Sequence, residues 1–245
     1  MRDDRSTEDA PAPSAYDAIA GIYDPWSRSV VEDVSFYVEE ALASGGPVVE
    51  LAVGTGRIAV RIAEAGIPVI GVDGSPAMLA VARDFARERD ADALLDLRLG
   101  DVREPPVAER VPLVVCPFRS LLHMLTDADR LAALRAAHTL LEPGGRFVFD
   151  VFAPSQEDVE ATGGRWIERE PGIFERADWD EDERTLTLSV RGGEAASTMT
   201  LAWLSPAEWQ RLLEVAGFEV EALYGWFDRR PYEGGEDTVW VARRR

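Results

Sequence analysis

The stretch that decides the fold is VVELAVGTGRIA, residues 48–59, together with PVIGVDGSPAM, residues 68–78. The run before Gly54 is short, apolar and rich in β-branched residues, which predicts a strand. Gly54 and Gly56 permit a tight turn, and helical spacing follows them. Asp73 then ends a second apolar run. Because a glycine turn lets the backbone approach a ligand and a carboxylate at the neighbouring strand end accepts ribose hydroxyls, this stretch predicts nucleoside binding.

The type of nucleoside is a separate question, because Gly54, Gly56 and Ala59 also satisfy the loose dinucleotide pattern of NAD-dependent enzymes. Glu50 inside the first strand, a helical region before it and signals at later strand ends favour S-adenosylmethionine instead. Glu50, Ala52, Gly54 and Gly56 match an acidic, small, Gly, Gly spacing. This spacing resembles the first motif of the class I S-adenosylmethionine-dependent methyltransferases, which implies that cofactor.

The resemblance continues in order over roughly residues 14–152. It includes GVDGSPAML, where the family uses Asp73 on the ribose and Met78 beside the adenine, and LGDVRE at 99–104, which faces the adenine. LLEPGGRFVFD at 140–150 is similar to the family's turn before its fifth strand. The residues that the resemblance assigns to the cofactor are Tyr16, Glu50, Ala52, Gly54, Gly56, Asp73, Gly74, Met78, Asp101, Val102, Pro117 and Phe118.

Strands and helices alternate through the first part of the chain. Strands are expected at 48–53, 68–72, 94–99, 111–116 and 146–151, and helices at 30–43, 56–65, 76–89 and 127–141. This rhythm predicts an α/β fold with a Rossmann-like, doubly wound sheet and ligands at the carboxyl ends of its strands. FEVEALYGW and DTVWVARR, near the end of the chain, predict a closing hairpin that brings the sheet to seven strands.

After Pro154 the pattern changes to short aromatic and β-branched runs, which predict an antiparallel β insertion after the fifth strand. SPAEW then predicts a helix with Ser205 as N-cap and Glu208 completing a capping box. The expected organisation is a disordered tail at 1–13, a cofactor-binding core with an N-terminal helical lid at 14–154, the insert at 155–204, and a final helix and hairpin at 205–245. The insert is expected over the cofactor mouth or in a dimer contact.

Composition excludes several classes of function. Acidic residues outnumber basic ones by 45 to 26, giving a net charge of -19, which argues against a nucleic-acid partner. Two histidines and the lone Cys116 are too few for a zinc site, so no metal is expected. Cys116 lies in an apolar strand and is expected to be an inert buried thiol. The chain shows neither an apolar run of membrane-spanning length nor a signal peptide, so a cytoplasmic location is expected.

Methyl transfer depends mainly on positioning, so a catalytic triad is not required. His123, just past the fourth strand in PFRSLLHM, is the candidate base, and a loop-ordering role is the alternative. Tyr16 and Tyr23 resemble lid tyrosines of small-molecule N-methyltransferases of the amino-sugar and glycine type, although simple helix packing also explains their spacing. Tyr23 is therefore a second catalytic candidate. Arg119 is expected either to line the pocket or to pair with a surface carboxylate, and His138 is expected to be a surface or packing residue.

The expected function is methyl transfer from S-adenosylmethionine to a small-molecule amine. The alternatives are O-methylation of a small hydroxylated metabolite, an NAD(P)-dependent oxidoreductase, and a non-catalytic nucleoside-binding domain. An oxidoreductase would need a Tyr-Lys or similar pair, and the chain contains no lysine. A cage of aromatic residues for a methylated ammonium is a further hypothesis, with a plain sheet core as its alternative. The chain is expected to act as a monomer or as a homodimer through the insert.

Overall fold

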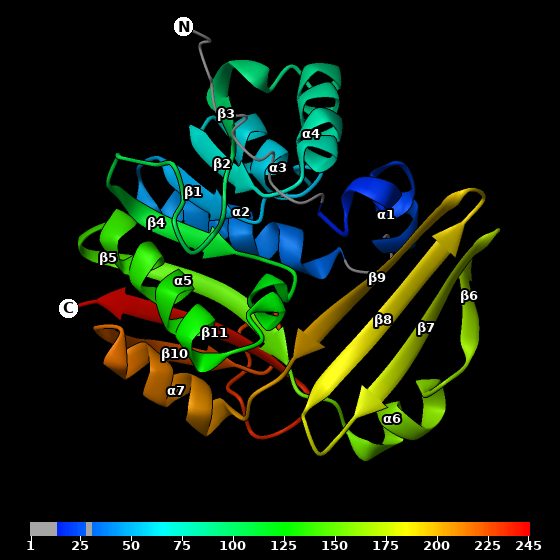
Figure 1. The fold of residues 1–245 in the computed structure, drawn as a ribbon. Helices are drawn as coiled ribbons and strands as arrows, with labels where there is room; N and C mark the ends of the chain where they lie inside the picture. The colour runs from blue at the N-terminus through cyan, green and yellow to red at the C-terminus, as the bar shows by residue number, and fades with distance from the viewer. Residues whose placement is uncertain (1–13, 28–30) are drawn as a thin grey trace, which may run out of the picture.

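The computed structural model describes residues 14–27 and 31–245, so the expected tail at 1–13 lies outside the described residues. Its centre is a seven-stranded sheet with the order β10-β11-β5-β4-β1-β2-β3 (Figure 1). The strands are β1 (Val48–Leu51), β2 (Val69–Asp73), β3 (Leu95–Leu99), β4 (Val111–Cys116), β5 (Leu141–Phe152), β10 (Phe218–Tyr224) and β11 (Asp237–Arg244).

Strands β1 to β5 run parallel, and β11 is antiparallel to both β5 and β10. This arrangement confirms the doubly wound sheet and its closing hairpin. The largest differences from the expected boundaries are two: β5 begins at Leu141 rather than 146, and the helix after the glycine turn covers Ala59–Glu64 rather than 56–65.

Alternating side chains divide the core between the two faces of this sheet. In β5, Phe147 and Phe149 belong to the cluster that includes residues of α5 (Asp127–Leu140) and α7 (Pro206–Val215). Val148, between them, belongs to the cluster on the other face, which includes residues of α2 (Glu32–Ser44), α3 (Ala59–Glu64) and α4 (Pro76–Glu88). Apolar residues in both registers are what a strand covered on both faces requires.

The antiparallel insert forms a separate four-stranded sheet with the order β6-β7-β8-β9. Its strands are β6 (Trp166–Glu170), β7 (Ile173–Asp180), β8 (Thr185–Gly192) and β9 (Ala195–Ala202). In Figure 1 this sheet projects to one side of the central sheet, with β9 passing close to α1 (Ala20–Ser27). Ile19 in η1 (Asp17–Ile19) packs against Ile173, Val190 and Met199 of the insert. The N-terminal segment and the insert therefore share a small core of their own.

Two helices differ from the sequence expectation. The order Tyr23, Asp24, Pro25 predicts that the first helix stops at the proline, and this is wrong, because Pro25 lies inside α1. A proline lacks the N–H that would bond the carbonyl four residues earlier, which is that of Gly21, and Gly21 is exposed to water. The helix α6 (Gln156–Thr162) was not expected; Ser155 caps it by accepting from the Asp158 N–H.

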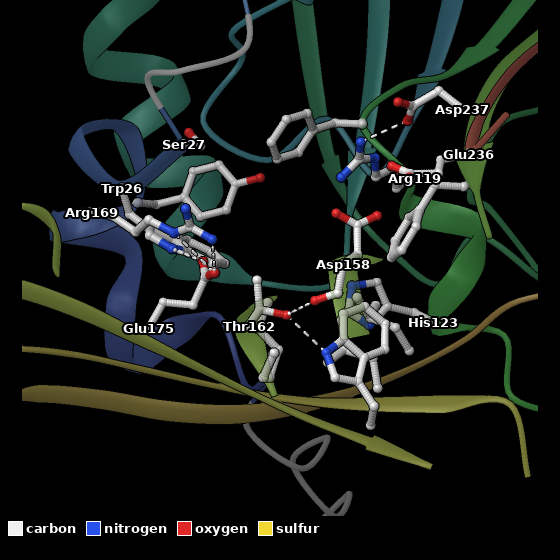
Figure 2. A pocket seen from close by; sticks show the side chains of 18 of the residues that line it. Trp26, Ser27, Arg119, His123, Asp158, Thr162, Arg169, Glu175, Glu236 and Asp237 are labelled. Atoms are coloured by element: carbon white, nitrogen blue, oxygen red, sulfur yellow. Dashed lines mark hydrogen bonds and ion pairs between the residues drawn. The ribbon is translucent and has the colours of Figure 1, made fainter. Parts of the chain in front are cut away.

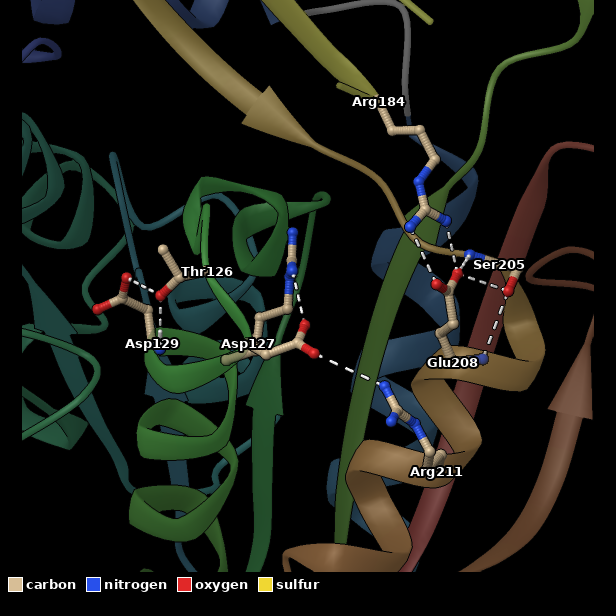
Figure 3. A network of polar contacts seen from close by, with 8 residues as sticks. Thr126, Asp127, Asp129, Arg184, Ser205, Glu208 and Arg211 are labelled. Carbon is tan, nitrogen blue, oxygen red and sulfur yellow. Dashed lines mark hydrogen bonds and ion pairs between the residues drawn. The ribbon is translucent and has the colours of Figure 1, made fainter. Parts of the chain in front are cut away.

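The capping box of α7 is confirmed and belongs to a larger polar network (Figure 3). The Ser205 N–H donates to Glu208 Oε2 at 2.8 Å, and Arg184, in the turn between β7 and β8, donates to the same carboxylate at 2.7 Å. Arg211 reaches Asp127 at 3.6 Å. These contacts fix the insert to α7 and α7 to α5. Within the described part of the chain, no helix is long and apolar enough to cross a membrane.

Candidate active site

The glycine turn and Asp73 meet at the carboxyl edge of the central sheet, because β1 and β2 are parallel neighbours. The Gly54 N–H donates to Asp73 Oδ2 at 2.8 Å, and the Ser75 N–H donates to Oδ1 at 2.8 Å. Burial raises the pKa of Asp73, while these two N–H groups act in the opposite direction. The carboxylate that was expected to bind a ribose is thus held in a fixed orientation.

The first cavity lies above this turn and has a volume of about 670 Å³. It brings together most of the residues that the sequence assigns to the cofactor. These are Tyr16, Ala52, Gly54, Asp73, Gly74, Met78, Asp101, Val102 and Phe118. His123 and Tyr23, the two candidate catalytic residues, also line it.

Three of the expected cofactor residues lie outside this cavity. Glu50 and Pro117 line a small adjoining cavity of about 30 Å³, together with Ala52 and Gly54. Gly56 lines none of the four cavities found among the described residues. A Cβ at Gly56 would lie 3.1 Å from Val60 and 3.2 Å from Ala82, so this glycine allows close packing of α3 and α4.

The second cavity adjoins the first and has a volume of about 350 Å³ (Figure 2). The insert contributes Trp179, Leu186, Leu188 and Leu201 to its wall, and α1 contributes Trp26. Its other residues include both apolar and charged side chains. The two cavities share four lining residues, which are Tyr16, Tyr23, Phe118 and His123.

Tyr16 and His123 form a hydrogen-bonded pair at this junction. The Tyr16 hydroxyl lies 2.8 Å from His123 Nε2. Burial lowers the pKa of His123 to about 4, although a hydrogen bond to the backbone of Thr200 opposes the shift. A neutral imidazole has one donor and one acceptor nitrogen, so the ring donates to Thr200 and accepts the Tyr16 proton. Both nitrogens are therefore engaged, and Tyr16, rather than His123, has lone pairs free to meet a ligand.

Comparisons with known proteins place this geometry in a family. The family model described as "Methyltransferase domain" matches residues 48–145. The solved structure of the CcbJ methyltransferase from Streptomyces caelestis is 28% identical, with a TM-score of 0.80 over 95% of this chain and 98% of that one. The cypemycin N-terminal methyltransferase from Streptomyces sp is 25% identical over 99% of both chains. A glycine/sarcosine N-methyltransferase from Parasynechococcus marenigrum is 30% identical over 51% of this chain and 45% of its own length.

The chain belongs to the class I S-adenosylmethionine-dependent methyltransferases. The residues of this methyltransferase fit that cofactor in two ways. Gly54 has φ +56°, and a Cβ there would meet no heavy atom within 4 Å, so a cofactor can approach the backbone closely. Glu50 is 2% exposed, and its Oε2 has no hydrogen-bond partner among the described residues. A buried carboxylate oxygen beside the cavity is suited to a ligand's ammonium group.

Sequence reasoning missed Asp150, which positions the junction of the methyltransferase's two cavities. Phe118 and Arg119 both adopt left-handed backbone conformations, with φ 58° and 62°. Their N–H groups donate to the two Asp150 oxygens at 2.8 and 3.0 Å, and the Tyr37 hydroxyl donates to Oδ1 at 2.6 Å. Burial raises the pKa of Asp150 to about 6, and the hydrogen bond from Tyr37 opposes this. A carboxylate inside the apolar run FVFDVF was the available signal.

Hydrogen bonds tie the N-terminal segment across the first cavity. Ser75 Oγ donates to Asp17 at 2.6 Å, and Thr55 Oγ1 donates to Asp24 at 2.6 Å. Trp26 Nε1 donates to Glu175 of the insert at 2.8 Å. The segment thus contacts the glycine turn, the N-cap of α4 and the insert, and its role as a lid stays a prediction.

The remaining sequence expectations have mixed outcomes. His138 packs edge-on against Phe218 with ring centroids 5.2 Å apart, and Cys116 is buried, both as expected. Arg119 satisfies both of its alternatives, because it lines the second cavity and pairs with Asp237 at 2.7 Å. The aromatic cage stays a hypothesis: Trp179 of the insert lines the second cavity, whereas Trp203 is a core residue. Among the described residues, no cluster of three or more potential metal ligands exists.

Proposed function

We propose that this methyltransferase methylates an amine of a small molecule that binds in the second cavity. The observation that carries the proposal is the junction, where Tyr16, Tyr23, Phe118 and His123 line both cavities. A group held in one cavity can therefore meet a group held in the other. The cypemycin and glycine/sarcosine enzymes are N-methyltransferases by name, which supports nitrogen as the acceptor atom.

The cofactor contacts are part of this proposal. We expect Asp73 to bind the ribose, Met78 and Val102 to contact the adenine, and Glu50 to face the ammonium of the methionine end. S-adenosylmethionine supplies a methyl group already activated by its sulfonium. The protein's task is to hold the acceptor nitrogen in line with that methyl at about 3–3.5 Å, which contributes roughly 7–11 kcal/mol.

Tyr16 is suited to orienting the acceptor nitrogen. Its proton is directed at His123, so its oxygen presents lone pairs to the cavity. An amine whose N–H donates to this oxygen directs its nitrogen lone pair away from Tyr16. Because Tyr16 lines both cavities, that lone pair can point toward the first cavity, where we expect the cofactor methyl group. His123 is neutral at pH 7 because its pKa is lowered, and it keeps the Tyr16 hydroxyl in this orientation. The amine itself needs to arrive unprotonated.

Turnover with defined acceptors tests the proposal. The protein is incubated with S-adenosylmethionine and panels of small amines and phenols, and S-adenosylhomocysteine and methylated products are measured by mass spectrometry. We expect N-methylated products, and Tyr16→Phe should lower kcat about tenfold, the effect of one lost hydrogen bond. Methylated phenols with no methylated amines would support the O-methyl alternative. Cofactor binding with no product from either panel would support the non-catalytic one.

Two further expectations belong to this proposal. The cavity volume of about 350 Å³ and the net charge of -19 both favour a small molecule over nucleic acid as the acceptor. A monomer or a homodimer through the insert is the expected assembly, and light scattering on the intact protein and on a variant with charges added to the outer face of the insert distinguishes these states.

A further inference from the structure

Ion pairs neutralise both arginines that line the second cavity. Arg169 reaches Glu175 at 2.7 Å, and Arg119 reaches Asp237 at 2.7 Å. In Figure 2 the two pairs lie on opposite sides of the cavity. Glu175 also accepts from Trp26 Nε1 at 2.8 Å. These charged groups therefore satisfy one another without a ligand.

Two further carboxyl groups in the same cavity have no such partner. Asp158, on α6, and Glu236, just before β11, both line it, and neither pairs with an arginine in the described ranges 14–27 and 31–245. A hydrogen bond from Ser155 lowers the pKa of Glu236, but the contact with Asp158 and burial raise it above its usual value. Two neighbouring carboxylates repel each other, and a cation bound between them would relieve that repulsion.

A buried hydroxyl gives independent evidence that this cavity receives a polar ligand. Ser27 is 5% exposed and lines the cavity, and its Oγ has no hydrogen-bond partner in the part of the chain that the structure describes. A buried polar group without a partner is destabilising. A ligand with a polar group beyond the reacting nitrogen relieves that cost.

An aromatic ring lies beside the carboxyl pair. Thr162 Oγ1 donates to the backbone oxygen of Asp158 at 2.7 Å and accepts from Trp179 Nε1 at 3.0 Å. The indole of Trp179 is thus fixed to the same helix as Asp158. Aromatic faces attract cations, and carboxylates bind them directly. A neutral hydroxyl lacks the positive charge that would balance two neighbouring carboxyl groups.

We propose that the acceptor carries a second positively charged group, in addition to the amine that receives the methyl, and that Asp158 and Glu236 bind this second group. The inference rests on the proposed function, because it assigns the second cavity to the acceptor. It narrows the substrate class to compounds with two amines, or with one amine and one other cationic group.

Binding of paired probes tests this inference without turnover. Linear aliphatic diamines and the monoamines of equal length are titrated by calorimetry into the protein saturated with S-adenosylhomocysteine, over a series of chain lengths. For at least one length, we expect the diamine to bind roughly tenfold more tightly than its monoamine, as one charge-assisted hydrogen bond would give. The Asp158→Asn, Glu236→Gln double variant should bind both equally. Glu157→Gln, an exposed neighbour on α6, is the matched control and should keep the preference.

Equal affinities for every pair in the wild type would overturn the inference, as would a preference that survives in the double variant. Thermal unfolding with S-adenosylhomocysteine verifies that each variant is folded, and Glu236→Gln alone serves if the double variant is not. Failure of the proposed function has a different result: diamines are preferred in the calorimeter, but no amine yields S-adenosylhomocysteine in the turnover assay.

Discussion

The two cavities of this methyltransferase are built in different ways. The first cavity, which we propose for the cofactor and call the cofactor cavity, depends on backbone: a turn with Gly54 at φ +56° and Ala52 at φ 58°, fixed by the Gly54 N–H that binds Asp73. The second cavity, which we propose for the acceptor and call the acceptor cavity, depends on side chains from α1, α6, the loop after β4 and the insert. A backbone site needs a few residues close together in the chain, whereas a side-chain site needs residues far apart to converge. Changes in the first should therefore affect cofactor binding, and changes in the second should affect the acceptor.

The largest effect is expected for Gly54→Val. A β-branched residue in the left-handed region costs about 1–3 kcal/mol, and its side chain would also enter the cofactor cavity. Binding of S-adenosylmethionine should become undetectable by calorimetry. Gly45→Val is the matched control, because Gly45 has φ +69° and open space around it but lines neither cavity. If both variants lose binding equally, backbone strain rather than the cavity is the cause.

Asp150→Ala should have the next largest effect, on stability. It removes the acceptor of three hydrogen bonds and leaves the Phe118 and Arg119 N–H groups without it. We expect a loss of roughly 2–4 kcal/mol in the free energy of unfolding, measured by urea denaturation. Asp150→Asn retains one acceptor and should fold.

The Asp150→Asn variant can show whether the two cavities respond differently to a change at their junction. Because the turn at Phe118 lies at the junction, the acceptor KM should rise more than the dissociation constant for S-adenosylhomocysteine. An equal change in both constants would contradict a positioning role for Asp150 and leave it a residue of general stability.

The difference between the cavities also explains what the sequence could predict. The cofactor site follows from GTG after a strand and from Asp73 at the next strand end, because parallel strands place these residues side by side. The acceptor site does not follow in this way. Asp158 lies on α6, a helix that was not expected, and Glu236 follows two glycines in a loop. The sequence around either residue therefore does not indicate that the two line the same cavity. The Tyr16–His123 contact joins residues 107 positions apart, and no periodicity encodes it.

Asp73→Ala is expected to weaken S-adenosylmethionine binding by roughly 1.5–3 kcal/mol, the range for a hydrogen bond to a charged group. Part of this loss comes from the turn itself, since Asp73 also accepts from the Gly54 and Ser75 N–H groups. Calorimetry on a variant with an unchanged melting temperature separates the two contributions. Asp96→Ala, on exposed β3, is the control, and unchanged affinity in folded Asp73→Ala would exclude the ribose assignment.

The smallest effect concerns the pH dependence of stability through His123. Its pKa is about 4 in the folded protein and 6.5 in a model peptide, so the unfolded chain binds more protons between these values. Its contribution to stability is therefore complete above about pH 6.5 and is lost as the pH falls toward 4. Because the side chain is half-buried, we expect about 1 kcal/mol of this loss between pH 7 and 5. His123→Asn should lack that component in urea denaturation at the two pH values, with the wild-type protein as the reference. A kcat profile without an inflection near pH 6.5 would agree with a neutral His123 that orients Tyr16, whereas an inflection that disappears in His123→Asn would identify this histidine as a titrating base.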